Sequence, residues 1–195
     1  VAARSLSTHS LSIFGDHQDI YAVRQTGACM LSSSSVEEAY HMAMVSHLAS
    51  IKSSLPFINF FDGFRTSHEI DKVKEIDLSK LETLIDKKAL RKFRDNGMIS
   101  GATTRGTAEN EDVYFQHTES RNGYYTKAID NVIYYMDKIN KICKTDYKPF
   151  NYYGDKSSDA VIIAMGSVCE CIKEVVDDLN KKGKKVGLVT VHLYR

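Results

Sequence analysis

Two short segments of this 195-residue chain mix charged and imidazole side chains with apolar residues. They are residues 12–27, SIFGDHQDIYAVRQTG, and residues 59–69, NFFDGFRTSHE. A solvated loop rarely needs Phe, Ile and Tyr among its charges, and a core strand rarely tolerates Asp-His or Arg-Thr-Ser-His. Each segment also has a glycine where a strand is expected to give way to a loop. Such segments are typical of sites at the carboxyl ends of a parallel sheet.

Three arginines, Arg4, Arg24 and Arg65, are the cationic residues closest to loop-like positions. An arginine fork binds a carboxylate through two parallel hydrogen bonds and stays charged at any working pH, so these residues would suit an acid substrate. The alternative for each is a structural salt bridge, which is the commoner role of an arginine. Its partner would be one of the nearby acids, Asp16, Asp19, Asp62 and Glu69.

Histidines in the same regions, His9, His17 and His68, are candidate proton carriers because imidazole titrates near neutral pH. A hydrogen-bonded structural histidine is the more common alternative. The run Asp16-His17-Gln18-Asp19 offers possible metal ligands, but its residue types and spacing do not fix a coordination geometry. No G-x-S-x-G, P-loop or G-x-G-x-x-G sequence is present, so no motif supports a serine hydrolase or a nucleotide site.

Charge and hydropathy narrow the classes of partner. Lys and Arg number 26 and Asp and Glu number 25, so there is no general electrostatic case for nucleic acid or acidic lipid. The longest apolar stretch, residues 55–61, contains Asn59 and is far too short to span a bilayer. No two of the four cysteines form a C-x-x-C pair, and we interpret all of them as packing thiols in a reduced compartment. They are Cys29, Cys143, Cys169 and Cys171.

Apolar runs and helical periodicity alternate along the chain. We expect strands at residues 28–32, 56–61, 160–165 and 186–191, the second and third of them buried. We expect helices at residues 35–53, 79–96, 126–143 and 167–180. Capping boxes are predicted at Ser35 with Glu38, Thr66 with Glu69 and Ser167 with Glu170.

The remaining segments are less regular. Residues 6–14 are ambiguous between strand and helix, and residues 113–115 suggest a short extended piece. Residues 97–112, rich in Gly, Thr and Asn, predict a loop, and residues 144–159 are the best candidate for a domain boundary. The strand–helix–strand unit at 160–191 has a short crossover, which implies parallel strands with a right-handed connection.

Longer runs are more specific than any of these spacings. They are GDHQDIYAVRQTG, SSSVEEA, FFDGFRTSHEI, RGTAEN, DVYFQ and MGSVCE with KKGKKVGLVTVHLYR. In order and spacing, over nearly the whole chain, they closely resemble pyruvate:ferredoxin oxidoreductase. The resemblance falls on the second half of that family's first domain and the opening unit of its second.

An α/β fold follows from the resemblance together with the alternation of elements. We expect residues 1–150 to be an incomplete thiamine-diphosphate-binding-type parallel-sheet domain. Residues 151–195 would then be the first strand–helix–strand unit of a transketolase C-terminal-like domain. The chain opens on Val-Ala-Ala-Arg without Met, and we expect it to be an internal piece of a larger protein. An incomplete sheet leaves an unpaired edge, so we expect the isolated piece to self-associate or to be partly disordered near residues 97–112.

The resemblance implies an enzyme that converts pyruvate and coenzyme A to acetyl-CoA and CO₂, with ferredoxin or flavodoxin as electron acceptor. It implies thiamine diphosphate, Mg²⁺ and [4Fe-4S] clusters in the full-length homodimer, none of them bound to this piece. The cytoplasm is the implied location, with a hydrogenosome or other mitochondrion-related organelle as the alternative; neither nucleic acid nor membrane is an expected partner. The enzyme could instead be an NADP-linked fusion relative, or it could act on another 2-oxo acid. A third alternative is that the isolated piece is a non-catalytic interface module.

One functional residue carries over from the resemblance. The family has an arginine, in a V-T-A-R-type run after a strand, that binds the pyruvate carboxylate. Val1-Ala2-Ala3-Arg4 occupies that place, with Ala2 where threonine is often found. Further candidates for a secondary site or an interface are His17, Arg24, Arg65 and His68. No catalytic, cofactor-binding or metal-binding residue is expected within the chain.

Overall fold

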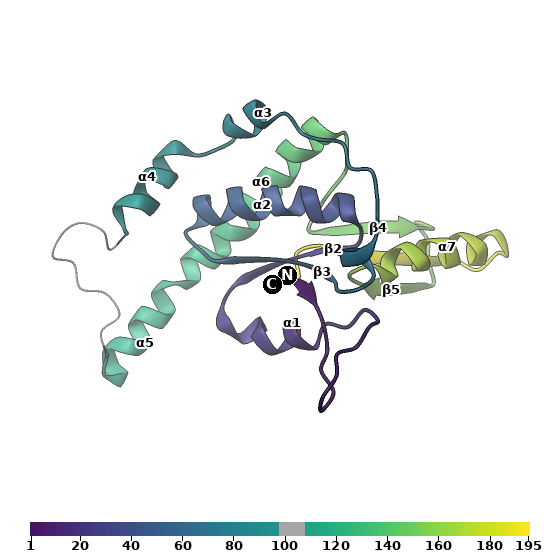
Figure 1. Cartoon of the computed structure of the whole chain (residues 1–195), viewed down its shortest axis with the longest axis horizontal. Helices are drawn as coiled ribbons and strands as arrows, with labels where there is room; N and C mark the ends of the chain where they lie inside the picture. The colour runs from purple at the N-terminus through teal and green to yellow at the C-terminus, as the bar shows by residue number, and fades with distance from the viewer. Residues whose placement is uncertain (98–107) are drawn as a thin grey trace.

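The computed structural model describes residues 1–97 and 108–195 of the chain. These residues form two sheets of three strands each, with helices packed on their faces (Figure 1). The first sheet contains β1 (Ala2–Ala3), β2 (Cys29–Ser33) and β3 (Phe57–Asp62), in the order β1-β3-β2 and all parallel. The predicted strands at 28–32 and 56–61 are confirmed to within one residue at each end.

Register brings the carboxyl ends of these three strands together. Ala3 pairs with Asp62 on one side of β3, and Ser33 pairs with Phe61 on the other. The residues that leave the sheet next are Arg4, Ser34 and Gly63, so they lie along one edge. This is where open parallel sheets form their ligand crevice.

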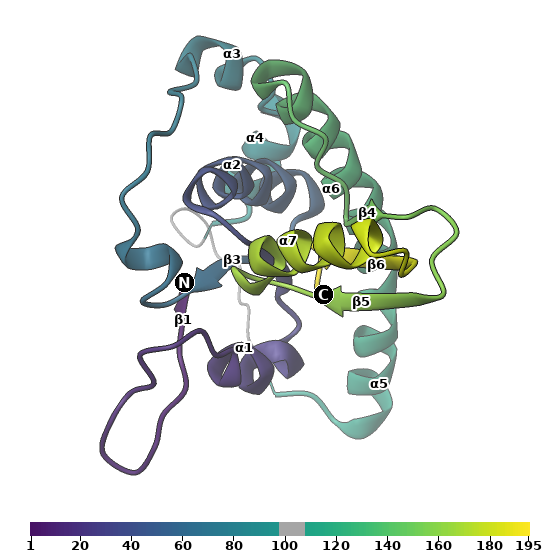
Figure 2. The same ribbon diagram turned by 90° about the vertical axis from the view of Figure 1, so that its right-hand side faces the viewer.

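Both faces of the first sheet are covered. Helix α2 (Val36–Ser53) lies on one face, and the short helix α1 (Gln18–Val23) lies on the other (Figures 1 and 2). Because side chains alternate along a strand, Leu31 of β2 joins the core under α2, whereas Met30 packs with Ile20 of α1. Every residue of β2 is buried, as expected for a strand covered on both sides.

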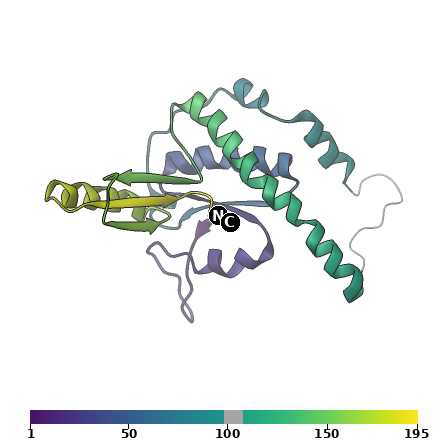
Figure 3. The same ribbon diagram turned by 180° about the vertical axis from the view of Figure 1, so that it is seen from behind.

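The long helix α6 (Asn122–Cys143) packs against α2 and completes the larger core (Figure 3). The predicted helix at 126–143 is confirmed and begins four residues earlier. Its buried side chains are Ala128, Val132, Tyr135, Met136 and Ile139. Ile129 and Ile133, which share the apolar helical period of this segment, are 51% and 39% exposed.

Helix α2 begins as its sequence predicts. The Ser35 side chain accepts a hydrogen bond from the Glu38 backbone N–H, which is the first half of the expected capping box. The Glu38 carboxylate reaches back one residue further than expected, to the N–H and hydroxyl of Ser34. The helix therefore has a well-satisfied start directly after β2.

The second sheet has the order β4-β6-β5, formed by β4 (Phe150–Gly154), β5 (Ala160–Ala164) and β6 (Val186–Val191). Strands β5 and β6 are parallel and are joined by α7 (Val168–Lys181), as predicted. Strand β4, antiparallel to β6, was not predicted, because Pro149 and Gly154 frame it as a loop.

The expectation that β5 is buried is wrong. Val161, Ile162 and Ile163 are 46%, 37% and 73% exposed. An apolar run predicts a strand but does not say what covers it, and here the buried cluster under α7 lies on one face of the sheet.

Residues 192–195 continue from β6 into the first sheet. The Ser32 N–H donates to the His192 carbonyl at 2.7 Å, and the Tyr194 N–H donates to the Met30 carbonyl at 2.9 Å. Leu31 and Leu193 form an antiparallel bridge. The outer edge of β2 is thereby paired with the chain's own C-terminal residues, and the two sheets are joined through this segment.

Several local predictions are wrong for identifiable reasons. The helix expected at 79–96 is two helices, α3 (Leu78–Glu82) and α4 (Lys87–Asp95), because Asp77 and Asp86 each cap a new start. Residues 113–115 lie inside helix α5 (Glu111–Ser120) rather than in an extended piece. The predicted loop at 97–112 falls largely on residues 98–107, which lie outside the described residues.

Two expected capping boxes do not form. Residues Thr66–His68 form the 3-10 helix η2 with no side-chain cap, and Ser167 does not cap α7 with its own hydroxyl. The second 3-10 helix, η1 (Arg24–Thr26), follows α1. Residues 6–14 contain neither helix nor strand, only an isolated bridge between Leu6 and Leu11. No described helix combines the length and the apolar character needed to cross a bilayer.

Candidate functional site

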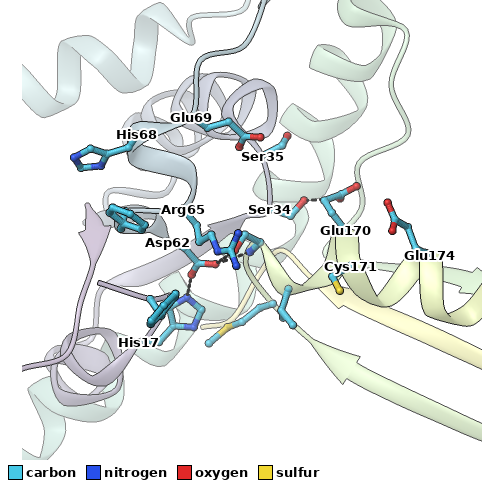
Figure 4. Close-up of a pocket in the computed structure, with 16 residues that line it drawn as sticks. His17, Ser34, Ser35, Asp62, Arg65, His68, Glu69, Glu170, Cys171 and Glu174 are labelled. Carbon is cyan, nitrogen blue, oxygen red and sulfur yellow. Dashed lines mark hydrogen bonds and ion pairs between the residues drawn. The ribbon is translucent and has the colours of Figure 1, made fainter. Parts of the chain in front are cut away.

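An open cleft of about 990 Å³ lies where the carboxyl ends of β2 and β3 meet the start of α7 (Figure 4). One wall is the segment after β3, which supplies Arg65, His68 and Glu69. The opposite wall is α7, which supplies Glu170 and Glu174 (Figure 4). The cleft therefore has the Arg65 guanidinium on one wall and the Glu170 and Glu174 carboxylates on the other.

The Asp62 carboxylate connects the first sheet to α7. Asp62 is the last residue of β3 and is 3% exposed. Its Oδ1 atom accepts a hydrogen bond from His17 Nε2 at 2.5 Å, and its Oδ2 atom accepts from the Ser167 N–H at 2.6 Å and also from the Ser167 hydroxyl. A carboxylate at this position caps the helix and interacts favourably with its dipole.

Two glycines make room for this cluster. A Cβ atom on Gly166 would lie 2.8 Å from Asp62 Oδ1 and 3.0 Å from His17 Cε1, and Gly166 has a φ of +80°. A Cβ atom on Gly15 would lie 3.2 Å from the Asp62 carboxyl group. Gly15 and Gly166 therefore permit the close approach of their segments to Asp62.

Burial alone would raise the pKa of the Asp62 carboxyl group. The hydrogen bonds from His17 and Ser167, together with the His17 charge, outweigh this effect and hold the pKa below its ordinary value. Asp62 is thus a carboxylate in the folded chain. The Ser167 hydroxyl bonds to this carboxylate and not to the imidazole, so these groups do not form a nucleophile–base pair. The cluster is a structural joint.

A second network of polar side chains lies on the other side of the cleft. Ser34 Oγ is 2.8 Å from Glu38 Oε2 and 3.0 Å from Glu170 Oε1, and Lys173 Nζ is 2.8 Å from that Glu170 atom. The hydroxyl has one proton, so it can donate to only one carboxylate at a time. Its contacts with Glu38 of α2 and Glu170 of α7 link these two helices, and Glu170 lies 136 residues after Ser34 in the sequence.

The same network includes His192, which is 3% exposed. Its Nδ1 atom faces the Lys148 carbonyl at 3.0 Å, and its Nε2 atom faces Glu38 Oε1 at 3.5 Å. Burial would raise the pKa of Glu38, but His192 and the two Ser34 donors lower it to about 2. Glu38 and Asp62 thus hold the same two sheets together from two sides.

Arg4 follows β1 directly and is half-buried. Its side chain runs across the position of Gly63, where a Cβ atom would be 2.4 Å from Arg4 Nε. The guanidinium forms no hydrogen bond or ion pair with any residue in 1–97 or 108–195. A half-buried arginine without a carboxylate partner is available to bind an acid.

The other sequence candidates are dispersed. His17 is hydrogen-bonded to Asp62, and Arg65 and His68 line the cleft, the latter bonded to Ser67 Oγ at 2.8 Å. Arg24 does not line the cleft and lies over the Tyr21 ring, 5.5 Å from its centre. His9 is exposed and bonded to Thr8.

The described part of the chain contains no set of side chains placed to bind a metal ion. No group of three or more His, Cys, Asp or Glu residues is placed to bind one, so the run Asp16-His17-Gln18-Asp19 does not form a metal site there. The four cysteines are unpaired thiols, but Cys171 is exposed, so the interpretation of all four as packing thiols is wrong for this residue. These residues do not fit a Mg²⁺–diphosphate site or an iron–sulfur cluster.

The sequence did not reveal the residues that join the two sheets. The sequence indicates Asp62 only as a salt-bridge partner for an arginine and gives no indication of Ser34 or His192. Their partners lie 105 to 154 residues away in the sequence, so no local pattern indicates them. The one local indication of a site at the carboxyl edge of the first sheet is the clustering of polar residues after β3.

Comparison with family models accounts for most of the chain. Residues 1–137 match a model described as pyruvate flavodoxin/ferredoxin oxidoreductase, thiamine diphosphate-binding. Residues 158–195 match a model described as pyruvate:ferredoxin oxidoreductase core domain II.

Curated relatives match over the whole chain. The chain is 53% identical to a pyruvate-flavodoxin oxidoreductase of Enterobacter agglomerans and 47% identical to a pyruvate:ferredoxin oxidoreductase of Moorella thermoacetica. It is 45% identical to the mitochondrial pyruvate dehydrogenase [NADP(+)] of Euglena gracilis. All of this chain is covered in each case, but only 17%, 17% and 11% of the respective relatives.

A solved structure supports the fold. It is 2-oxoglutarate:ferredoxin oxidoreductase from Magnetococcus marinus with 2-oxoglutarate, coenzyme A and succinyl-CoA bound. The TM-score is 0.59 at 16% identity, over 98% of this chain and 36% of that one. The expected α/β fold with a parallel sheet is confirmed.

Proposed function

Because the chain belongs to the pyruvate flavodoxin/ferredoxin oxidoreductase family, we propose that it forms part of a larger enzyme that oxidises pyruvate. Within that enzyme, this chain binds the substrate carboxylate through Arg4. The chain spans about a sixth of the length of the relatives named pyruvate-flavodoxin and pyruvate:ferredoxin oxidoreductase, so the complete activity requires further domains.

The free guanidinium of Arg4 is the observation that supports this role. Arg4 follows β1 at the carboxyl edge of a parallel sheet and is not among the residues that line the cleft; its side chain lies beside Gly63, and no described residue neutralises it. An arginine fork matches a carboxylate in shape and charge, and fixing a small keto acid in one orientation lowers the barrier to its reaction. Asp62 does not compete for the guanidinium, because its oxygens are already bound to His17 and Ser167.

In the proposed reaction, pyruvate and coenzyme A give acetyl-CoA and CO₂, and an electron pair passes to ferredoxin or flavodoxin. Thiamine diphosphate would supply the carbanion chemistry when bound, since that chemistry belongs to the cofactor. The described residues do not fit Mg²⁺ or [4Fe-4S] clusters, so we assign both to the remaining domains. We likewise propose that the full-length protein is a homodimer.

NADP is the alternative electron acceptor. The Euglena gracilis relative named pyruvate dehydrogenase [NADP(+)] is 45% identical to this chain, only slightly less than the ferredoxin- and flavodoxin-linked relatives. A fused reductase module would then replace the separate electron carrier. We place the enzyme in the cytoplasm, with a mitochondrion-related organelle as the alternative.

We also propose a domain boundary between residues 150 and 151. Strand β4 begins at Phe150 and belongs to the second sheet, which supports a boundary close to this point. In the isolated chain the cleft and the joint remain, but the other domains of the enzyme do not. We therefore expect the isolated chain to be inactive, as a non-catalytic interface module would be.

The function is tested by assaying the purified full-length protein with pyruvate and coenzyme A. We expect CO₂ release and acetyl-CoA formation that depend on an added acceptor, and separate assays with ferredoxin, flavodoxin and NADP identify which one is used. 2-Oxobutyrate and 2-oxoglutarate in place of pyruvate test the substrate. An absence of pyruvate-dependent CO₂ release with every acceptor would overturn the proposal.

A further inference from the structure

Among residues 1–97 and 108–195, Arg4 has no strand partner to hold its backbone. Strand β1 consists of Ala2–Ala3, and its last ladder bond with β3 runs from the Gly63 N–H to the Ala3 carbonyl at 2.9 Å. After Arg4 the chain enters a segment without helix or strand until Gln18. An unpaired backbone at this point would leave the direction of the Arg4 side chain undefined.

Asp19 supplies the missing contact. Its Oδ2 atom accepts a hydrogen bond from the Arg4 backbone N–H at 3.0 Å. In the opposite direction, the Asp19 N–H approaches the Arg4 carbonyl at 3.4 Å. Asp19 lies in the first turn of α1, and its Oδ1 atom accepts from the Ile20 N–H at 2.7 Å. This one carboxylate therefore ties the end of β1 to the start of α1.

The carboxylate binds the Arg4 backbone and leaves its guanidinium free. No ion pair joins the two side chains in the described part of the chain. Gly63 sets the path of the side chain, since a Cβ atom there would lie 2.4 Å from Arg4 Nε and 2.7 Å from Arg4 Cδ. Asp19 thus holds the Arg4 backbone, and the absence of a side chain at Gly63 leaves room for the path of the Arg4 side chain.

We infer that Asp19 is a positioning residue, which fixes the Arg4 guanidinium for the carboxylate of a 2-oxo acid by holding the Arg4 backbone. The inference rests on the proposed role of Arg4. It assigns Asp19 a function different from the salt bridge that its charge suggests. Because a fork must meet a carboxylate in both distance and plane, a loosened backbone weakens substrate binding more than it slows turnover.

Asp19→Asn in the full-length enzyme is the test. An amide has one acceptor oxygen in place of two, so it cannot hold the Arg4 and Ile20 N–H groups together. We expect the KM for pyruvate to rise by about 5- to 20-fold, while kcat changes by less than about 3-fold. Asp19→Glu keeps the charge but displaces it by one methylene, and we expect an intermediate KM.

Asp16→Asn is the matched control. The Asp16 carboxylate accepts from the Gln18 N–H at 3.0 Å, also at the start of α1, but it does not contact Arg4. We expect its kinetics to remain those of the wild type. Equal KM values for Asp19→Asn and Asp16→Asn would overturn the inference.

A double-mutant cycle with Arg4→Ala separates positioning from a general structural role. If Asp19 acts through Arg4, Asp19→Asn has no further effect on KM in the Arg4→Ala background. A KM effect that persists there would show that Asp19 acts on the fold and would also overturn the inference. Arg4→Ala alone reports on the proposed function, and wild-type kinetics for that variant would contradict the Arg4 assignment. If Arg4→Ala raises KM but Asp19→Asn leaves it unchanged, only the role of Asp19 is contradicted.

Discussion

The Asp62 carboxylate accepts hydrogen bonds from both the backbone N–H and the hydroxyl of Ser167, a residue 105 positions further along the chain. This contact places the end of β3, in the first sheet, at the N-terminus of α7, which connects two strands of the second sheet. His17 completes the contact from the loop before α1. The edge of the sheet that Arg4 follows is therefore hydrogen-bonded to the start of α7.

Gly166→Ala tests how tightly this joint is packed. Gly166 has a φ of +80°, and a Cβ atom there would lie 2.8 Å from Asp62 Oδ1. We expect the free energy of unfolding to fall by about 3 kcal/mol or more, because the left-handed backbone costs about 1–2 kcal/mol and weakened buried hydrogen bonds add a similar amount. Urea denaturation measures the change.

Gly183→Ala is the control for the backbone contribution. Gly183 has a φ of +79°, nearly the same as that of Gly166, but a Cβ atom there would have no neighbour within 4 Å. We expect a loss of only about 1–2 kcal/mol. Equal losses for the two variants would contradict the tight packing around Asp62.

Glu38→Gln changes the acid stability of the chain. The pKa of Glu38 falls from its ordinary 4.5 to about 2, since His192 and Ser34 outweigh the effect of burial. A lowered pKa stabilises the folded state above pH 4.5, and this contribution is lost as the pH falls towards 2. It amounts to at most about 3 kcal/mol. We expect the variant to be less stable at pH 6 and less sensitive to pH between 4.5 and 2.

The measurement is the free energy of unfolding in urea as a function of pH. Glu37→Gln is the control, because the Glu37 carboxylate forms no hydrogen bond with any residue that the structure describes. A pH profile for Glu38→Gln that parallels the wild type across this range would show that Glu38 is not paired with His192.

The cysteines should differ in their reaction with iodoacetamide. Cys169 is buried, and burial raises the pKa of its thiol to about 11. Cys171 is exposed and lines the cleft. Since the thiolate is the reactive form, we expect Cys171 to be alkylated at least about 100-fold faster at pH 8. Mass spectrometry of the native chain measures both rates, and comparable rates would argue against the packing of α7.

Local signals predicted the elements that carry the site. The Ser35 cap, the apolar run of β2 and the β5–α7–β6 unit are each defined by residues close in sequence. Strand β4 was missed because its pairing with β6 depends on residues about 35 positions away, and Pro149 and Gly154 suggested a loop.

The joint could not be predicted in the same way. The Ser167–Glu170 spacing favours a capping box, but the Ser167 hydroxyl bonds to Asp62, which no local pattern indicates. The prediction of Arg4 came from the resemblance and not from its neighbours. Sequence reasoning alone favoured a salt bridge, whereas in the structure the Asp19 carboxylate accepts from the Arg4 backbone N–H and forms no ion pair with the Arg4 guanidinium.

Saturation kinetics of the full-length enzyme with pyruvate test the central claim most directly. We predict that Arg4→Ala lowers kcat/KM by at least about 100-fold, which corresponds to about 2.7 kcal/mol of lost transition-state stabilisation. Arg121→Ala is the matched control, since Arg121 is an exposed arginine between α5 and α6, and we expect wild-type kinetics. An unchanged kcat/KM for Arg4→Ala would contradict the assignment of Arg4 to the substrate carboxylate.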